Sequence, residues 1–319
     1  MFNVGIDLGG TKIAAGLVDG NGNIVSKLSM PTGRGRHYTD IARDMAGLVF
    51  EVVRQGGAEI GQVESIGIGS PGAADCNEGT IIYCSSLNFR NVPLKTELQK
   101  HIDLPVFLEN DANCAALAES MTGAAKQAGH SITVTFGTGI GCGIIINGKL
   151  YGGFNHGAGE AGHMVIKIGG EKCSCGRNGC WEAYASGTAL ARQTKKAAAD
   201  NPSSLINRMS EDDMVRIDGK TAFDAARKGD ETALRVVNQY ILYVSEGLIN
   251  LINLLMPEVV VIGGGVSLQG KYFLEPLKKL VEDGVYGEKK LPQTKLIAAR
   301  LGNDAGIIGA AMLKRQAFL

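Results

Sequence analysis

Residues 3–20 have the sequence NVGIDLGGTKIAAGLVDG, which sets the fold class expected for this chain. Apolar runs on both sides of Gly9-Gly10-Thr11 predict a strand, a glycine turn and a second strand. A similar order recurs in residues 131–151, SITVTFGTGIGCGIIINGKLY, where Asn147-Gly148 predicts a hairpin turn. The two segments begin roughly 130 residues apart and predict an internal duplication of one half of the fold.

Helices and further strands follow from the apolar periodicity. Helical spacing is clearest in residues 38–55, 112–122, 187–199 and 231–255. Short apolar runs that end in glycine or polar residues predict strands at 65–69, 106–109 and 258–262. Because strands and helices alternate, we expect an α/β protein, and we place a domain boundary between residues 111 and 125.

Composition narrows the class of protein. The chain has 319 residues, and its 32 Lys+Arg balance 32 Asp+Glu, so no net charge favours nucleic acid or an anionic membrane. Its 45 glycines, about 14% of the chain, predict tight turns or close backbone contact with a ligand. Residues 1–10 lack the pattern of a secretory signal, and residues 127–148 hold too many glycines and threonines for a membrane helix.

The glycine turns are candidate phosphate sites. In Asp7 to Lys12, DLGGTK, glycines let backbone N–H groups approach anionic oxygens, and Asp7 can hold the water shell of a magnesium ion. Two further glycine loops follow strands, at residues 137–141 and 263–267. Taken alone, any one of these three loops is explained equally well as a tight hairpin turn. Three at strand ends favour a nucleotide site.

Two better-known nucleotide-binding motifs match this sequence only in part. Gly219-Lys220-Thr221 resembles the end of a Walker A loop, but Met214 stands where that motif requires its first glycine. Residues 67–72, GIGSPG, satisfy G-x-G-x-x-G after a strand, which makes a dinucleotide-binding dehydrogenase a competing hypothesis. Residues 73–80 are turn-like rather than helical, and that motif needs a helix there.

A carboxylate follows the strand predicted at 106–109. Asp111 stands in the segment Glu109-Asn110-Asp111-Ala112-Asn113, between that strand and a helix. An Asp or Asn at this place commonly caps the helix. The carboxyl end of a strand also faces the crevice of an α/β fold, so Asp111 is a candidate catalytic group.

The strongest local pattern combines one histidine with three thiols. His163, Cys173, Cys175 and Cys180 supply the four ligands of a tetrahedral Cys3His zinc site, which has no open position for a catalytic water. We therefore predict structural zinc; the alternative is reduced thiols in a loop. The odd total of seven cysteines favours a reducing cytoplasm over a disulfide framework. Glu160 and Glu182 flank the cluster, either as hydrogen-bond acceptors for a polyol or as surface acids.

Together these residues resemble the ROK family of repressors and sugar kinases, and its bacterial glucokinases in particular. The resemblance spans DLGGTK, the segment ENDAN, residues 157–163, and CSCGRNGCWE at 173–182, which fits C-x-C-G-x-x-G-C-x-E at every fixed position. It implies a two-domain, actin-like ATPase fold of the hexokinase type, related to ribonuclease H, with a central cleft and a zinc knuckle. The implied domains are 1–115 with a C-terminal helix in 302–319, and 116–301.

The resemblance also implies roles for the motif residues. Asp111 corresponds to the general base that takes the proton of the sugar 6-hydroxyl as it attacks ATP. The implied sugar ligands are Asn110, Asp111, Glu160, His163, Glu182 and Gly72. The implied nucleotide contacts, with Mg2+ near Asp7, are Asp7, Gly9, Gly10, Thr11, Lys12, Gly137, Thr138, Gly139, Gly264 and Gly265.

Several alternatives stay open within the family. Another hexose, such as N-acetylmannosamine, fructose or allose, can replace glucose, because the pocket around Gly72, Asn88 and residues 157–160 sets the choice. Polyphosphate can replace ATP as donor. A sugar-responsive regulator is the hypothesis from another class; six residues precede Asp7 here, and we expect no DNA-binding domain. The family also implies a homo-oligomer, a dimer or a tetramer, in the cytoplasm.

Overall fold

The computed structural model describes residues 1–33, 35–211, 213–287 and 293–316 of the chain. The chain divides into two compact units. Unit 1 comprises Met1–Thr133, Gly143–Gly159 and Ala299–Leu319, and unit 2 comprises Val134–Cys142 and Glu160–Ala298. Each unit is described separately.

Unit 1 is built on a five-stranded sheet with the order β3-β2-β1-β4-β8. Its strands are β1 (Phe2–Leu8), β2 (Lys12–Val18), β3 (Ile24–Pro31), β4 (Val63–Ser70) and β8 (Val106–Asn110). Strand β1 pairs antiparallel with β2 and parallel with β4, and Leu8 lies opposite Ile13 beside the turn. The predicted hairpin around Gly9-Gly10-Thr11 is confirmed.

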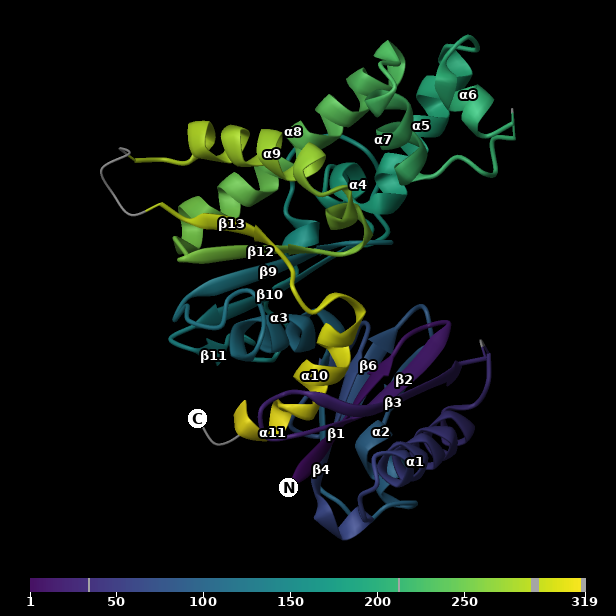
Figure 1. Cartoon of the computed structure of the whole chain (residues 1–319), viewed down its shortest axis with the longest axis vertical. Helices are drawn as coiled ribbons and strands as arrows, with labels where there is room; N and C mark the ends of the chain where they lie inside the picture. The colour runs from purple at the N-terminus through teal and green to yellow at the C-terminus, as the bar shows by residue number, and fades with distance from the viewer. Residues whose placement is uncertain (34, 212, 288–292, 317–319) are drawn as a thin grey trace. The chain divides into compact units, whose positions relative to one another are not determined.

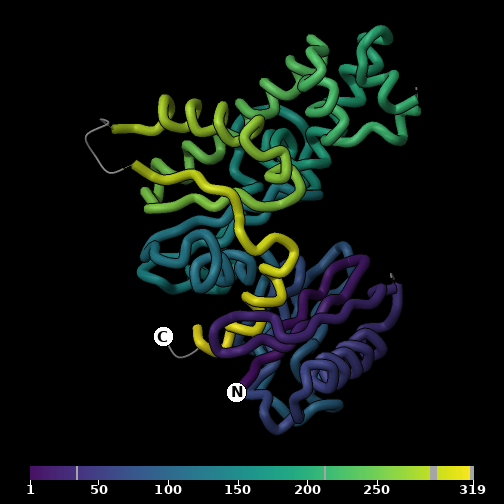
Figure 2. Tube along the Cα trace, in the orientation of Figure 1, coloured from purple at the N-terminus to yellow at the C-terminus, as the bar shows by residue number. Residues whose placement is uncertain are grey.

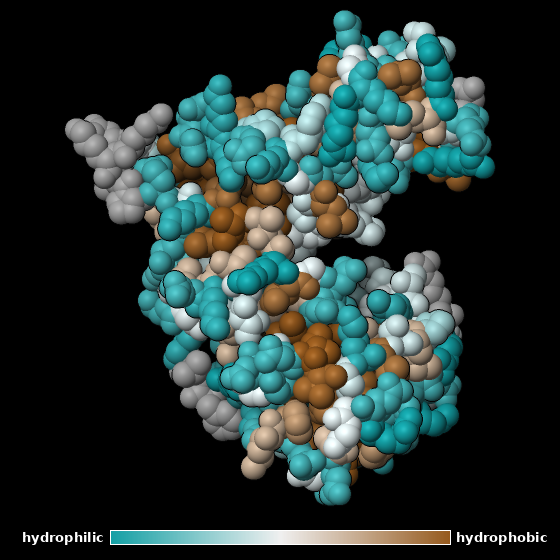
Figure 3. Space-filling view, viewed as in Figure 1, coloured by the Kyte–Doolittle hydropathy of each residue, from teal (hydrophilic) through white to brown (hydrophobic). Residues whose placement is uncertain are grey.

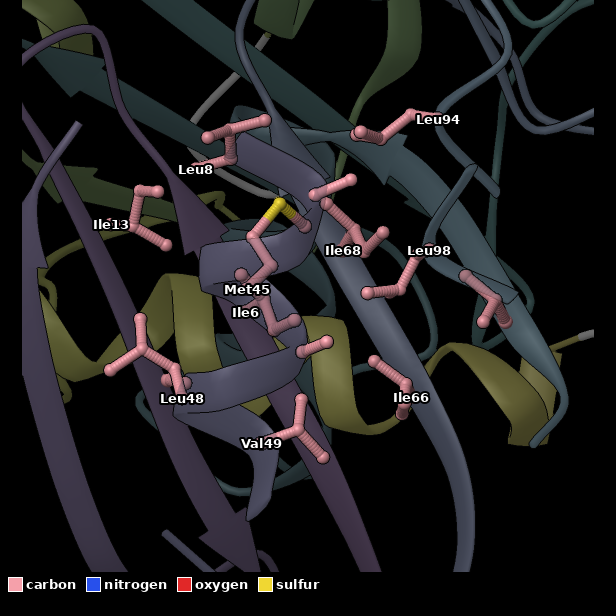
Figure 4. Close-up of a cluster of buried hydrophobic side chains, with 14 of the residues drawn as sticks. Ile6, Leu8, Ile13, Met45, Leu48, Val49, Ile66, Ile68, Leu94 and Leu98 are labelled. Carbon is pink, nitrogen blue, oxygen red and sulfur yellow. The ribbon is translucent and has the colours of Figure 1, made fainter. Parts of the chain in front are cut away.

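Helices cover both faces of this sheet. Helix α1 (Tyr38–Gln55) packs on β2 and β3, and α10 (Ala305–Ala311) packs on β1 and β4 (Figure 1). The buried side chains of α1 include Ile41, Met45 and Val49, spaced four residues apart as one face of an amphipathic helix requires. Figure 4 shows Met45 and Val49 among Ile6, Ile66 and other side chains of the strands.

Glycine lets α10 approach the sheet closely. A Cβ atom on Gly5 of β1 would lie 1.8 Å from the carbonyl oxygen of Ile307, and one on Gly67 of β4 would lie 1.7 Å from that of Ala310. No other residue fits at such positions without displacing the helix. Figure 2 accordingly shows the C-terminal segment running beside the N-terminal strands.

A small antiparallel sheet follows β4. Its strands are β5 (Ala73–Asp75), β6 (Thr80–Cys84) and β7 (Phe89–Val92), and helix α2 (Leu94–Gln99) and the turn η1 (Ile60–Gln62) complete this part of unit 1. Because G-x-G-x-x-G at 67–72 leads into a strand and not into a helix, the dinucleotide-binding hypothesis lacks its structural context.

The second five-stranded sheet has the order β11-β10-β9-β12-β13. Its strands are β9 (Ser131–Phe136), β10 (Ile140–Ile146), β11 (Lys149–Leu150), β12 (Val259–Gly263) and β13 (Lys295–Ala298). Strands β10 and β11 form the hairpin predicted around Asn147-Gly148, both of which have positive φ as a type I′ turn needs. The two large sheets thus repeat one topology, a three-stranded meander followed by two later strands, as an internal duplication predicts.

Strands of this sheet belong to both units, and helices form most of unit 2. They are α4 (Glu182–Ala185), α5 (Gly187–Asp200), α6 (Leu205–Met209), α7 (Gly219–Arg227), α8 (Glu231–Leu255) and α9 (Lys271–Gly284), with the turns η2 (Ala161–His163) and η3 (Gly265–Gln269). The segment Gly219-Lys220-Thr221 begins α7, where Asp218 and Thr221 cap each other. The Walker-like string is therefore a capping box.

An apolar hollow in unit 2 lies apart from the predicted motifs. Apolar side chains gather around α8, α9 and β13 on the face seen in Figure 3, where Ile252, Val281 and Leu296 help to line the hollow. No predicted site residue lines it. Among the helices that the structure describes, none is long and apolar enough to cross a membrane.

Two predictions differ from the structure. The helix expected near the C-terminus is divided into η4 (Gly302–Asp304), α10 and α11 (Leu313–Gln316). The boundary expected at residue 115 would cut through α3 (Asp111–Met121), which lies wholly in unit 1. Helix α3 stays with unit 1 because Cys114 and Leu117 pack with Ile308 of α10.

Candidate active site

The first glycine turn of unit 1 is firmly held yet open to solvent. The N–H group of Gly9 donates to the carbonyl of Lys12 at 2.9 Å, and the hydroxyl of Thr32 donates to the carbonyl of Gly9 at 2.7 Å. The side chains of Thr11 and Lys12 are exposed. The turn therefore has the fixed backbone and free surface that a phosphate site needs.

Asp7 and Asp111 lie close enough to influence each other. Asp7 is the second-last residue of β1 and is half-buried. Burial and the charge of Asp111 raise its pKa from 3.8 to about 6, while the charge of Lys12 lowers it. Burial also raises the pKa of Asp111, against a hydrogen bond from the N–H of Ala112 that lowers it. Two nearby carboxyl groups with raised pKa values, one near the end of β1 and one directly after β8, are typical of a functional site.

Asn110 and Asp111 have different local roles. The side chain of Asn110 is the N-cap of α3, because its Oδ1 atom accepts from the N–H of Ala112 at 2.9 Å and from that of Asn113 at 3.3 Å. Its Nδ2 atom donates to the carbonyl of Gly72 at 3.3 Å. Asp111 accepts from the N–H of Ala112 at 2.8 Å through Oδ1. The capping task thus falls mainly to Asn110.

Gly72 is required by the backbone. Its φ is 90°, and a Cβ atom there would lie 2.2 Å from the carbonyl oxygen of Tyr83. The turn between β4 and β5 can therefore close only around glycine. This geometry aims the Gly72 carbonyl at Asn110 and brings one expected sugar contact beside another.

The second and third glycine loops meet in unit 2. Gly264 has a φ of 78°, and a Cβ atom there would lie 2.4 Å from the carbonyl oxygen of Phe136, the residue before the Gly137–Gly139 loop. The carbonyls of that loop are occupied: Gly137 accepts from the N–H of Gly187 at 2.7 Å and Thr138 from the hydroxyl of Thr188 at 2.8 Å. Gly265 borders open space.

The four predicted metal ligands of unit 2 converge. The ligand atoms of His163, Cys173, Cys175 and Cys180 all lie within 4.8 Å of one another. The Sγ atom of Cys173 is 3.6 Å from Nδ1 of His163, and the Sγ atoms of Cys175 and Cys180 are also 3.6 Å apart. Zinc bonds of about 2.0–2.3 Å place tetrahedral ligands about 3.3–3.8 Å apart, so the cluster fits the ion.

The two ring nitrogens of His163 face different groups. While Nδ1 faces Cys173, Nε2 lies 3.9 Å from the Oε2 atom of Glu160. The side chain of Glu160 is 64% exposed and that of His163 is 32% exposed. The imidazole can therefore join the thiol cluster to an open polar surface.

Glu182 fixes the second glycine loop. Its Oε2 atom accepts from the N–H of Ile140 at 2.9 Å, and a Cβ atom on Gly139 would lie 2.4 Å from the same oxygen. Its Oε1 atom is 3.5 Å from the hydroxyl of Ser174, next to the thiol cluster. The carboxylate thus links the cluster to the glycine loop.

Sequence reasoning missed two contributors to unit 1. A Cβ atom on Gly306, at the start of α10, would lie 3.1 Å from Cγ of Asp7, so the C-terminal segment helps to bury this carboxyl. Thr32 at the end of β3 holds the first turn. The glycine at a helix start in Asp304-Ala305-Gly306 was a sequence signal for this close packing. No signal in the sequence marked Thr32.

Comparison with known proteins follows the same motifs along the whole chain. The sequence profile of the ROK family matches residues 3–317. A glucokinase of Streptomyces coelicolor is 36% identical over 318 residues, which are 99% of this chain and 98% of that protein. A glucokinase of Thermotoga maritima is 35% identical over 98% of this chain and 97% of that protein. The xylose repressor of Bacillus subtilis is 31% identical over 100% of this chain and 78% of the repressor.

Solved structures agree with the fold. A ROK family glucokinase from Streptomyces griseus in complex with glucose and AMPPNP has a TM-score of 0.85 and 36% identity, covering 99% of this chain and 100% of that one. A ROK hexokinase from Thermus thermophilus has a TM-score of 0.84 and 35% identity, with coverage of 99% and 100%. The profile match and the full-length relatives establish what the motifs indicated: the chain belongs to the ROK family.

Proposed function

We propose that this protein transfers the γ-phosphoryl group of ATP to the 6-hydroxyl of glucose, with Asp111 as general base. The similarity to two glucokinases over nearly their full length, and to a structure that holds glucose and AMPPNP, supports this choice within the family.

The observation that carries the proposal is the pair of carboxyl groups beside the first glycine turn. Asp111 is a half-buried carboxyl whose pKa is raised by burial, and the charge of Asp111 acts on Asp7 near the end of β1. A base works best when its pKa approaches the working pH, so the environment of Asp111 suits proton removal from a hydroxyl. Phosphoryl transfer needs positioning and charge neutralisation of the phosphates. Asp7 would supply them through a metal ion, Gly9 through the backbone turn, and Lys12 through its positive charge.

The glycine loops are assigned to the nucleotide. The residues assigned to this role are Asp7, Gly9, Gly10, Thr11, Lys12, Gly137, Thr138, Gly139, Gly264 and Gly265. The fit rests on exposed Lys12, on the tethered turn at Gly9, and on the close backbone approach at Gly264. A carboxylate with room for water suits Mg2+, so Asp7 would hold the ion that accompanies ATP, and this ion supplies charge neutralisation on the phosphates.

The sugar is assigned to Asn110, Asp111 and Gly72 of unit 1 and to Glu160, His163 and Glu182 of unit 2. Asn110 is oriented by its capping bonds, and Glu160 presents an exposed carboxylate beside Nε2 of His163. Glu182 is the weakest of these assignments, because its oxygens already accept from Ile140 and lie near Ser174. An actin-like fold whose cleft closes on the sugar would exclude water and protect ATP from hydrolysis.

Structural zinc is assigned to His163, Cys173, Cys175 and Cys180. The support is the separation of the ligand atoms, which suits a tetrahedral ion, and the absence of an open ligand position in a Cys3His set. Zinc on Nδ1 would fix the ring, so that Nε2 meets a sugar hydroxyl at a constant angle.

The test is ADP release by the purified protein with Mg-ATP and each of glucose, N-acetylmannosamine, fructose, allose and no sugar. Turnover on glucose well above the others supports the proposal. Turnover on another hexose would support the same phosphoryl transfer but identify a different sugar as the substrate. No turnover on any sugar refutes the kinase and favours a sugar-responsive regulator, which electrophoretic DNA-shift assays then test.

A second candidate is a kinase with a wider or different hexose range. The similarity to a ROK hexokinase from Thermus thermophilus, at 35% identity, favours it. Single hydroxyl contacts decide such selectivity, since an unpaired buried polar group strongly disfavours the wrong sugar. Comparing kcat/KM for glucose and mannose separates this candidate from a glucose-specific enzyme, and polyphosphate in place of ATP tests the donor.

We also place the protein in the cytoplasm as a homo-oligomer, a dimer or a tetramer. In the described part of the chain all seven cysteines are free thiols, which suits a reducing compartment. Light scattering coupled to gel filtration measures the oligomer, and a monomeric mass would contradict this assignment.

A further inference from the structure

Three side chains of metal-ligand type meet in unit 1, away from the Cys3His cluster. Cys76 follows β5, Glu109 lies in β8, and His156 lies in the loop between β11 and η2. The Sγ atom of Cys76, a carboxylate oxygen of Glu109 and an imidazole nitrogen of His156 all lie within 4.8 Å of one another. None of the three residues is assigned to ATP or to the sugar, although Glu109 directly precedes Asn110 in the segment ENDAN.

Glu109 is buried and already oriented. It is 7% exposed, and its Oε1 atom accepts from the N–H of Asn110 at 2.8 Å and from Nδ2 of Asn113 at 3.0 Å. Both bonds use the same oxygen, which fixes the carboxylate and leaves the second oxygen for another partner. A buried carboxylate aimed at a thiol is unlike the exposed acids that cluster by chance on surfaces.

The thiol and the imidazole complete the group. The Cys76 thiol is half-buried, and its Sγ atom lies within 4.8 Å of a carboxylate oxygen of Glu109. His156 is held in a closed loop, in which the N–H of Ala158 donates to the carbonyl of Gly152 at 3.0 Å. The φ of His156 is 59°, a left-handed conformation that few residues with a Cβ atom adopt.

These donors select a particular kind of ligand. Mg2+ and Ca2+ prefer sites made of oxygen, whereas a thiolate, an imidazole and a carboxylate together suit zinc and related transition metals. Tetrahedral zinc needs its ligand atoms about 3.3–3.8 Å apart, so side-chain shifts of about 1 Å would close the site. Three protein ligands also leave a fourth position open, unlike the closed Cys3His set.

We propose that Cys76, Glu109 and His156 form a second site for Zn2+ or a similar transition-metal ion, within unit 1 and independent of the Cys3His cluster. On binding, the Cys76 proton leaves to solvent and the thiolate binds the metal, and a carboxylate oxygen of Glu109 and a ring nitrogen of His156 complete the protein ligands. Water fills the fourth position.

The experiment measures bound Zn2+ per chain after equilibrium dialysis against micromolar Zn2+. We expect two ions per chain in the wild type and one in Cys76→Ala and in His156→Asn. Asparagine is chosen because it tolerates the left-handed backbone of residue 156. The matched control is His101→Asn, which removes an exposed histidine of the same unit and should keep two ions.

A second measurement identifies the ligands. Co2+ added to Cys180→Ser, in which the Cys3His set is broken, should give the absorption of a single-thiolate site, and the added change Cys76→Ala should abolish that absorption. If Cys180→Ser fails to fold, the difference spectrum between wild type and Cys76→Ala serves instead. Equal zinc content and equal spectra in wild type, Cys76→Ala and His156→Asn would overturn the proposal, whatever the kinase assay shows.

Discussion

Units 1 and 2 hold their candidate functional groups in different ways. In unit 1, Asp7 and Asp111 stand at the ends of β1 and β8, and the paired strands, the cap of α3 and the packing of α10 position them. In unit 2, Cys173, Cys175 and Cys180 lie in a segment with little regular structure, and their thiols mainly contact each other and His163. The sheet preforms the first arrangement, whereas the proposed zinc ion would hold the second together.

The largest expected effect concerns Asp111 in unit 1, where the sheet positions the functional groups. Asp111→Asn should lower turnover by about 10² to 10⁴, the usual contribution of a positioned base. The free energy of unfolding should stay the same or rise, because burial disfavours the charged form of this carboxyl. Steady-state kinetics and urea unfolding measure both. Asp103→Asn, an exposed change in the same unit, is the control. Near-normal turnover in Asp111→Asn would remove the assigned base.

The next largest effect is expected from loss of zinc at the proposed Cys3His site of unit 2. If zinc is bound as proposed, its removal by a chelator, or Cys180→Ser, should raise the KM for glucose by about 10- to 100-fold with a smaller change in kcat, since the metal would orient His163 and take no part in the chemistry. Cys142→Ala removes a buried thiol of unit 2 outside the cluster and should keep the metal and the KM. Elemental analysis that finds no zinc in freshly purified, active protein would contradict the structural role.

The packing that supports unit 1 should be sensitive to single methyl groups. Gly5→Ala should lower the free energy of unfolding by about 1 to 3 kcal/mol, because the new Cβ atom meets the carbonyl oxygen of Ile307 at 1.8 Å. Gly47→Ala in α1 has open space around the new atom and should raise it by about 0.5 to 1 kcal/mol. Urea unfolding compares them. Equal stabilities would mean that α10 does not rest on β1 as described.

The smallest effect concerns pH. The pKa of Asp7 is about 6 in the folded protein against a usual value of 3.8, so the folded state binds more protons between these values. Stability contributed by this group should therefore fall as the pH rises from about 4 to about 6. Because the charge of Asp111 is one cause of the shift, Asp111→Asn should make the decline shallower, and Asp103→Asn should not. Identical slopes in all three proteins would contradict the coupling.

Local patterns predicted the regular elements well. The ranges 38–55 and 231–255 match α1 and α8 to the residue, since each has an apolar stripe and a clear end, and Asp230 caps α8 through the N–H of Ala233. The C-terminal helix expected within 302–319 is interrupted at Met312. Both parts pack on strands of the unit 1 sheet, and Lys314 of α11 bonds to Glu64 of β4 at 2.7 Å. Such long-range contacts override a local pattern.

The two candidate metal sites mark the limit of prediction from sequence. Cys173, Cys175 and Cys180 are neighbours along the chain, so their spacing was enough to predict a zinc site, together with His163 ten residues earlier. Cys76, Glu109 and His156 are far apart along the chain and meet only through the folded sheet and its loops. Nothing in their spacing indicates that meeting.

The sequence therefore established the α/β class, the hairpin of each sheet, the glycine turns, the Cys3His set and the ROK resemblance, because each depends on residues close together in the chain or on a recognisable motif. Tertiary structure determined the ionisation of Asp7 and Asp111, the close approach of α10 at Gly5 and Gly67, and the Cys76 group. Burial and charge act through space, and a linear pattern carries neither.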